Sequence, residues 1–160
     1  MISLLRVDDR LIHGQIAVVW TKYLGVSRII VANDKVSTND SQKMALSLAV
    51  PEGIKAFFKN IVDTQKILND PRASKMKILV IVNSPQDALK LIDGLETNVD
   101  SVNLGNYGRV NNMAGIKKQQ LADNIFVTDD DITILKKLKD KVPDVFIQSV
   151  PNSTKSKYEG

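Results

Sequence analysis

Seven consecutive residues near the start of the chain carry side chains suited to holding and transferring an anionic group. His13, the only histidine, directly precedes Gly14, and Arg10 lies three residues before it. An imidazole can act as a nucleophile, and a guanidinium can bind a phosphoryl group through two parallel hydrogen bonds. Asp8 and Asp9 could hold one ring nitrogen protonated so that the other attacks. The segment predicts phosphoryl chemistry, and a solvated turn with surface ion pairs is the alternative.

The elements around this segment favour an anion site. Residues 2–7 predict a strand and residues 15–24 predict an amphipathic helix, so His13 follows a strand and stands at a helix start. The first backbone N–H groups of a helix lack intrahelical acceptors and attract negative charge. Gly14 has no Cβ, which lets the backbone approach a bound group closely. The expected phosphate-binding residues are Gly14, Gln15 and Arg6.

Short apolar runs alternate with amphipathic stretches along the whole chain. We expect strands at residues 2–7, 28–32, 54–58, 77–82, 101–104, 126–128 and 145–150, and helices at 15–24, from about 37–40 to 50, at 61–68, 85–92 and 129–141. This order predicts one α/β domain over residues 1–160, with a mostly parallel central sheet of about seven strands and helices on both faces. Such sheets bind ligands at the carboxyl ends of their strands. Residues from about 152 to 160 are polar and are expected to form a loose tail.

The composition excludes several classes of function. The chain has no cysteine, which rules out disulfides, thiolate chemistry and cysteine-ligated metals, and its single histidine leaves only a carboxylate-only magnesium site open. No apolar run approaches the roughly 20 residues that cross a bilayer, and residues 1–10 do not read as a signal peptide. The loop at residues 103–109 is rich in glycine and asparagine and could wrap an anion, but it makes no nucleotide fingerprint.

The charge of the chain admits an anionic partner. The formal net charge is +4 and the isoelectric point is about 9.2, which also describes an ordinary soluble surface with a slight excess of lysine. Aromatic residues make up only 5% of the chain and are not interleaved with lysines. Because binding of single-stranded nucleic acid relies on aromatic stacking platforms, this pattern weighs against that class.

Residues 6–15, Arg-Val-Asp-Asp-Arg-Leu-Ile-His-Gly-Gln, closely resemble the N-terminal signature of IIB subunits of the mannose/fructose/sorbose family of the phosphoenolpyruvate-dependent phosphotransferase system. The likeness continues to the end of the chain, at Trp20, Asn33-Asp34, residues 49–55, residues 103–106 and residues 148–151. Residues 141–144, Lys-Val-Pro-Asp, replace a glycine-containing turn that is common before the last strand of the family. That departure is a loop change and leaves the expected site intact.

The resemblance implies a phosphoryl carrier with a single α/β domain. His13 would accept phosphate, usually on Nδ1, from a phosphohistidine of the IIA protein and pass it to a sugar that the membrane subunits IIC and IID translocate. Arg10 would neutralise the phosphoryl group and Asp8 would orient the site. Neither a metal nor another cofactor is needed, and no nucleic acid takes part. The protein would be cytoplasmic and held at the inner face of the membrane through the transporter.

Three other functions stay open at this point. A histidine-dependent phosphatase also places His-Gly after a first strand, but it commonly uses a second histidine that this chain lacks. A nucleic-acid-binding domain would explain the isoelectric point and would bind with a steep salt dependence. A regulatory carrier would be phosphorylated on His13 without any sugar being transported.

Overall fold

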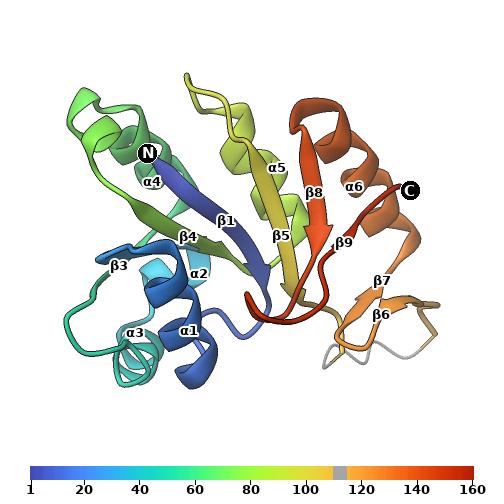
Figure 1. Ribbon diagram of the computed structural model, residues 1–160, viewed down its shortest axis with the longest axis horizontal. Helices are drawn as coiled ribbons and strands as arrows, with labels where there is room; N and C mark the ends of the chain where they lie inside the picture. The colour runs from blue at the N-terminus through green and yellow to red at the C-terminus, as the bar shows by residue number, and fades with distance from the viewer. Residues whose placement is uncertain (110–114) are drawn as a thin grey trace.

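The computed structural model describes residues 1–109 and 115–160 and is built around a seven-stranded sheet (Figure 1). The strands lie in the order β3-β2-β4-β1-β5-β8-β9, with β1 at Ile2–Asp8, β2 at Arg28–Ala32, β3 at Lys55–Lys59, β4 at Ile78–Val82, β5 at Ser101–Asn106, β8 at Asp144–Ile147 and β9 at Ser156–Lys157. Neighbouring strands are parallel except for the antiparallel pair β8–β9. A separate antiparallel pair is formed by β6, Gln119–Ala122, and β7, Ile125–Val127.

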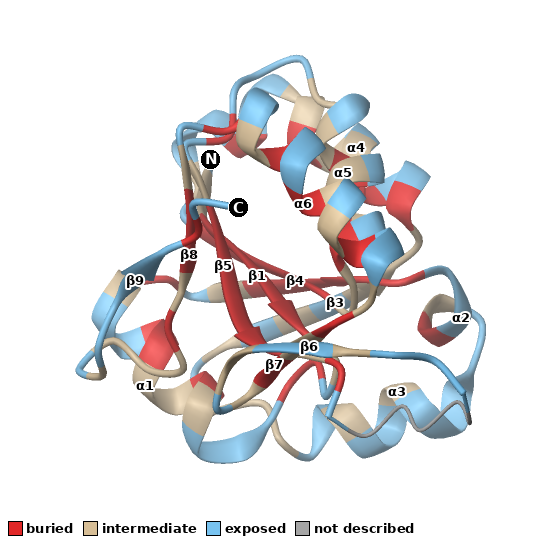
Figure 2. Cartoon of the chain, turned by 90° about the vertical axis from the view of Figure 1, so that its right-hand side faces the viewer, coloured by how far each residue is buried: buried red, intermediate tan, exposed pale blue. Residues whose placement is uncertain are grey.

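Helices cover both faces of the sheet (Figure 2). One face carries α1 at Gly14–Leu24, α2 at Asp34–Ser37 and α3 at Asp40–Ser47, and the other carries α4 at Ile61–Asn69, α5 at Pro85–Asp93 and α6 at Asp129–Lys141. A short 3₁₀ turn, η1 at Pro71–Lys75, precedes β4. Side-chain caps fix where the helices begin: Ser84 accepts from Asp87, and Thr128 forms a capping box with Asp131.

The core lies in two layers because side chains of a strand alternate between its faces. On β1, Leu5 and Val7 pack with residues of α4, α5 and α6, whereas Leu4 packs with residues of α1. The central strand β4 is buried at every position, as a parallel strand covered on both faces should be. The expected single α/β domain with helices on both faces is therefore confirmed.

The expected elements are found within a few residues of their predicted bounds, and the strand predicted at 28–32 is found at Arg28–Ala32. The strand predicted at 126–128 is found as β7, but it pairs with β6 outside the central sheet, in which β9 is the seventh strand. The loose tail expected from about residue 152 needs correction. Ser156–Lys157 pairs with β8, and the Tyr158 backbone N–H donates to the Val145 carbonyl at 2.7 Å. The Tyr158 ring is only 5% exposed. One apolar ring and the unpaired edge of β8 are enough to hold this polar segment.

The two edges of the sheet are occupied by short strands. At one edge β3 reads Lys-Ala-Phe-Phe-Lys, so that Lys55 and Lys59 bracket Phe57 and Phe58. At the other edge β9 contributes only two residues, and both are exposed. Long exposed hydrophobic edges invite pairing with other chains, and this sheet presents none at β3 or β9.

A polar group interrupts the apolar layer between the sheet and α1. The side chain of Arg6 points to the same face of the sheet as that of Leu4. Although it is charged, it is only 2% exposed, and its Cζ lies 5.6 Å from the centre of the Trp20 ring. Its Nη1 donates to Oδ1 of Asn103 at 2.7 Å and to the Gln148 carbonyl at 3.3 Å. Gly105 makes room for the guanidinium, because a Cβ there would lie 2.0 Å from Cζ of Arg6.

Gly105→Ala should therefore destabilise the fold. The added methyl group must displace an anchored, buried guanidinium, and overpacking of this kind costs about 1–3 kcal/mol. Gly14→Ala is the matched control, because a Cβ at Gly14 meets no atom within 4 Å and exposed changes usually stay within about 0.5 kcal/mol. Urea unfolding of the two variants measures the difference. Equal free energies of unfolding would show that the Arg6 side chain moves aside freely.

Candidate functional site

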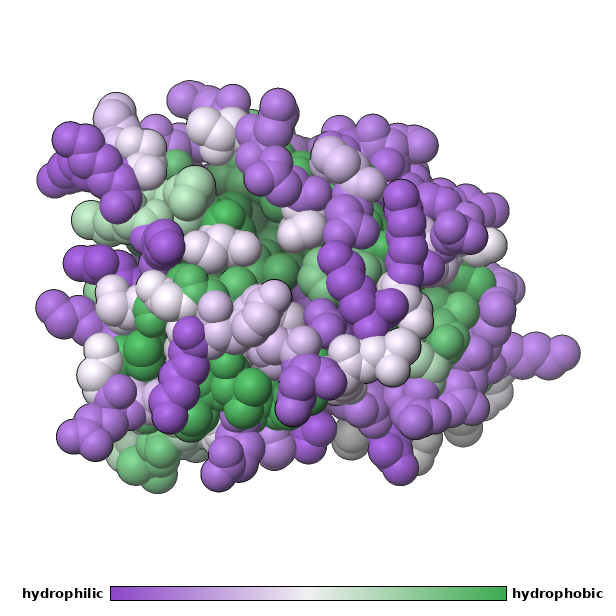
Figure 3. Space-filling view, viewed as in Figure 1, coloured by the Kyte–Doolittle hydropathy of each residue, from purple (hydrophilic) through white to green (hydrophobic). Residues whose placement is uncertain are grey.

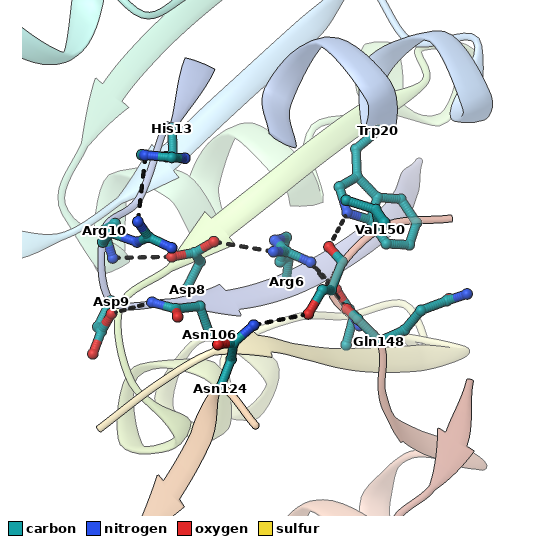
Figure 4. Close-up of polar contacts among 12 residues, drawn as sticks. Arg6, Asp8, Asp9, Arg10, His13, Trp20, Asn106, Asn124, Gln148 and Val150 are labelled. Carbon is teal, nitrogen blue, oxygen red and sulfur yellow. Dashed lines mark hydrogen bonds and ion pairs between the residues drawn. The ribbon is translucent and has the colours of Figure 1, made fainter. Parts of the chain in front are cut away.

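The carboxyl end of β1 lies where the connections that follow two neighbouring strands leave on opposite faces of the sheet. From β1 the chain turns to α1 on one face, while from the neighbouring β4 it turns to α5 on the other. In open α/β sheets, such a switch point leaves a crevice in which ligands bind. The loop of residues 9–13 emerges there, next to the loops that follow β5 and β8 (Figure 4).

The loop after β1 is held in a tight turn. The Asp8 carbonyl accepts from the Leu11 N–H at 2.9 Å, and Oδ1 of Asp8 accepts from the Arg10 N–H at 3.0 Å. Leu11 has a left-handed φ of 58°, a conformation that costs about 1–2 kcal/mol for a residue with a Cβ. The side chains of Leu11 and Ile12 are 5% and 3% exposed, and their burial stabilises the strained turn. Arg10 and His13 are left exposed at the surface.

His13 presents its imidazole at the start of α1. It is the N-cap residue, but its side chain makes no capping hydrogen bond. Nη1 of Arg10 lies 3.3 Å from Nε2 of His13, as Figure 4 shows. A guanidinium can only donate, so a hydrogen bond in this contact requires Nε2 to accept, in the tautomer whose proton is on Nδ1. The first turn of α1 contains no acidic residue, and Gly14 and Gln15 are exposed, which leaves this helix start open to an anion.

Asp8 lies beneath the turn. Its Oδ2 forms an ion pair with Nη2 of Arg6 at 3.1 Å, and both side chains are 2% exposed. Burial raises the pKa of the Asp8 carboxyl, while the positive charge of Arg6 acts in the opposite direction. Asp8 thus joins the buried Arg6 guanidinium to the backbone of Arg10.

Asp9 ties the loop after β1 to the loop after β5. Its Oδ1 accepts from Nδ2 of Asn106 at 2.7 Å, and its Oδ2 accepts from the Gly108 N–H at 2.9 Å. Gly108 has φ +82°, and a Cβ there would lie 1.9 Å from the carbonyl oxygen of Phe126, so only glycine fits. The start of the glycine- and asparagine-rich loop is therefore fixed beside the first one.

Two sequence-based assignments need correction. Asp8 and Asp9 bind arginine, amide and backbone groups instead of the imidazole, and the group that contacts the ring is Arg10. Arg6, expected to bind phosphate, directs its guanidinium into the interior toward Asp8, Asn103 and Gln148. The reason is shared: residues 6 and 8 belong to a buried strand, so their side chains meet interior partners.

The remaining predicted residues lie together. His13, Arg10, Gly14 and Gln15 are all exposed around the start of α1. Other elements enclose Arg6. Asn103 and Gly105, in the segment expected to wrap an anion, lie in β5 against Arg6 instead, while Trp20 and Gln148 had no expected role. Nε1 of Trp20 donates to the Ser149 carbonyl at 2.9 Å, tying α1 to the chain after β8. The only signal for them was that Trp20 and residues 103–106 and 148–151 took part in the family likeness.

His13 lies outside the main cavities at this edge of the sheet. A cavity of about 370 Å³ is lined by residues of β5, β7, β8 and the following loop, among them Gly105, Asn124 and Ser149. A second, of about 230 Å³, is lined by residues that include Asp9, Tyr107 and Asp131. Within residues 1–109 and 115–160, no group of three or more histidine or acidic side chains could hold a metal ion. None of the described helices is long and apolar enough to span a membrane.

Comparison with known proteins identifies relatives over almost the full length of the chain. The family model of the phosphotransferase system sorbose subfamily IIB component matches residues 2–159. A probable phosphotransferase enzyme IIB component of Streptococcus pyogenes serotype M6 is 39% identical over 157 residues, covering 97% of this chain and 95% of that protein. The mannose-specific EIIAB component of Escherichia coli K12 is 31% identical over 157 residues, covering 98% of this chain and 47% of that protein.

A solved structure has the same fold. The N-acetylgalactosamine-specific IIB component 1 of Escherichia coli superposes with a TM-score of 0.86 at 31% sequence identity, covering 99% of both chains. The family match spans nearly every described element, including β1, the turn with His13, and β9. The chain therefore belongs to the sorbose subfamily of IIB components of the sugar phosphotransferase system.

Proposed function

We propose that this protein carries a phosphoryl group on His13 between a IIA protein and a sugar. The observation that carries the proposal is an exposed imidazole at the start of α1, with the guanidinium of Arg10 3.3 Å from its Nε2. Arg10 occupies one ring nitrogen. Among the described residues Nδ1 has no hydrogen-bond partner, which leaves it open to the donor. Its lone pair is available in the tautomer with the proton on Nε2, which the ring adopts when Arg10 moves from Nε2 to the phosphoryl oxygens.

The first transfer exchanges a phosphoryl group for a proton between two histidines. The P–N bond of the phosphohistidine on IIA breaks, and its electron pair stays on the donor nitrogen. Nδ1 of His13 attacks from the tautomer that carries its proton on Nε2 and forms the new P–N bond, the ring gives up the Nε2 proton, and the donor imidazole takes up one proton in return. Arg10 stabilises charge on the phosphoryl oxygens, and the N–H groups of Gly14 and Gln15 offer further donors at the positive end of α1.

The second transfer delivers the group to a sugar. A sugar hydroxyl oxygen forms the new P–O bond, the P–N bond breaks with its electron pair returning to Nδ1, and the hydroxyl proton passes to the imidazole. The membrane subunits IIC and IID present the sugar in this proposal, so the protein works at the cytoplasmic face of the membrane. The name of the Escherichia coli EIIAB relative supports a IIA partner, because that protein is named for IIA and IIB together.

The exposure of His13 favours a carrier over a phosphatase. Hydrolysis needs a water molecule positioned beside the phosphoryl group within an enclosed site, whereas exchange between two proteins needs both histidines at the surface. His13 and Gly14 are exposed, and the cavities of this edge are lined by other residues.

The face of the molecule that carries α1 and α3 suits a transient protein contact. On α1 and α3, Tyr23, Met44 and Leu48 are 69%, 71% and 86% exposed, and apolar side chains are visible among hydrophilic ones over these helices in Figure 3. Interfaces between proteins that exchange groups are small and partly polar, which permits fast release. We propose that IIA docks on this side of the molecule.

His13→Gln should abolish phosphorylation and leave the fold intact, because an exposed loop side chain contributes little to the core. The protein is incubated with phosphoenolpyruvate, the general phosphotransfer proteins and IIA, and the site is mapped by mass spectrometry. Circular dichroism of His13→Gln serves as the folding control. An acid-labile, base-stable phosphate on the variant would disprove the assignment.

Arg10→Lys should slow transfer almost as much as Arg10→Ala. Lysine keeps the charge but loses the planar, two-point grip on phosphoryl oxygens. One charge-assisted hydrogen bond of this kind contributes about 1.5–3 kcal/mol, or roughly 10- to 150-fold in rate. Rapid-quench measurement of transfer from phosphorylated IIA gives the rate constants. Arg72→Lys, in the turn that precedes β4 at the amino ends of the strands, is the control. Wild-type rates for both Arg10 variants would make Arg10 a mere surface charge.

The rate of association with IIA should fall as salt concentration rises. Arg10 and Lys22 are exposed near His13 and attract an acidic donor surface, whereas Arg6 is buried and paired with Asp8. Attraction over more than ~8–10 Å is screened at physiological ionic strength. Stopped-flow transfer across a salt series at fixed pH tests this, with Lys22→Gln expected to flatten the dependence. A rate independent of salt would remove electrostatic steering from the proposal.

A further inference from the structure

Arg6 is anchored by three strands beneath the proposed site. It projects from β1, its Nη1 binds Asn103 of β5, and the same atom binds the carbonyl of Gln148, one residue past β8. Gly105 leaves the space in which the guanidinium lies, and the Trp20 ring covers it from α1. The guanidinium is therefore held from several directions and has little freedom to move.

The guanidinium of Arg6 pairs with Asp8 but leaves one of its own buried donors without an acceptor among the described residues. Nη2 is directed at Oδ2 of Asp8, while Nε is a buried donor with no acceptor among the described residues. Buried donors are nearly always satisfied, so an unpaired one calls for a reason. A buried ion pair is also weak support for stability, since apolar residues of similar volume often replace one without loss. The orientation of Arg6 points to a role beyond holding the core together.

The contacts continue from Arg6 to the reactive imidazole. Asp8 receives Nη2 of Arg6 on one carboxylate oxygen and the Arg10 N–H on the other. The side chain of Arg10 then reaches Nε2 of His13. Leu11 holds a left-handed conformation between Arg10 and His13, and the Asp8 carboxylate helps to hold this strained turn together with the burial of Leu11 and Ile12. Displacement of the Asp8 carboxylate would thus alter where the Arg10 side chain starts.

We propose that Arg6 is a positioning residue for phosphoryl transfer, which holds Asp8 beneath the turn and thereby keeps the Arg10 guanidinium beside the His13 ring, within reach of an incoming phosphoryl group. This inference rests on the proposed function of His13 as the phosphoryl carrier. Arg6 itself touches neither the phosphoryl group nor the imidazole. Burial raises the pKa of the Asp8 carboxyl, and the positive charge of Arg6 acts against that effect.

Arg6→Met tests the proposal, because it keeps most of the side-chain volume and removes the charge and the donors. The double variant Arg6→Met/Asp8→Asn guards against loss of folding, since it leaves no unpaired buried charge and keeps an acceptor oxygen at position 8. Arg72→Met is the matched control. Arg72 also pairs with an aspartate two positions away, Asp70 at 2.8 Å. Its side chain, however, is 86% exposed, and it lies just before β4, at the amino ends of the strands.

The first measurement is the tautomer of His13 in the unphosphorylated protein. Because the chain has one histidine, long-range ¹H–¹⁵N spectra of [¹⁵N]histidine-labelled protein report on this ring alone. They are recorded at about pH 9, where histidine side chains are generally neutral. Wild type and Arg72→Met should favour a proton on Nδ1. Both Arg6 variants should shift toward Nε2–H, as Arg10→Ala does, because Arg10 no longer donates to Nε2.

The second measurement is transfer from phosphorylated IIA. We expect kcat to fall about 10- to 100-fold in both Arg6 variants, because Arg10 is no longer placed to stabilise the phosphoryl oxygens, and misplacing a group near the reacting atoms has effects of this size. KM for IIA should stay unchanged because the docking surface is untouched. Circular dichroism and thermal unfolding show whether the double variant is folded.

The outcomes separate the two proposals. Absence of label on wild-type His13 would overturn the proposed function, while the tautomer spectra would still test the link from Arg6 to the ring. Labelling of wild type, together with a wild-type tautomer and kcat in the folded double variant, would overturn the inference and make Arg6 a structural residue only. A shifted tautomer and a reduced kcat in the folded double variant support it.

Discussion

The ion pair between Arg6 and Asp8 is the interaction on which the arrangement of this site depends. Removing two charges from water carries a penalty of several kcal/mol per ion, which is offset only by close hydrogen-bonded partners. Asn103 and the Gln148 carbonyl supply such partners, and Gly105 gives the space. Residues that are distant in the sequence must therefore meet at one point, where the carboxyl ends of β1, β5 and β8 come together.

Above this buried pair, the groups proposed to take part in transfer, Arg10 and His13, are exposed. A carrier must accept a phosphoryl group and release it again, so its donors must stabilise the group without trapping it. A single guanidinium and the start of one helix fit that requirement. The strained turn at Leu11 keeps them on a rigid base, because the burial of Leu11 and Ile12 fixes its backbone. The buried residues below the site thus fix the position of the turn, while Arg10 and His13 on it remain accessible at the surface.

The features predictable from sequence were those fixed by neighbouring residues. The strand at Arg28–Ala32 and the capped start of α6 depend on local periodicity and capping, and His13, Arg10 and Gly14 meet because they share one turn. The partners of Arg6 and Asp9 lie about a hundred residues away, on β5 and beyond, so spacing along the chain carried no signal for them. The anchoring of Tyr158 was hidden for a similar reason, because its polar neighbours dominated the composition of that segment.

The short strands at the edges of the sheet bear on how the protein behaves at high concentration. A parallel sheet folds slowly, and exposed backbone donors and acceptors on its outer strands can recruit other chains during that time. Lysines at both ends of β3 bring charge close to Phe57 and Phe58, and β9 is too brief to template a long pairing. Strand-to-strand polymerisation is thereby disfavoured.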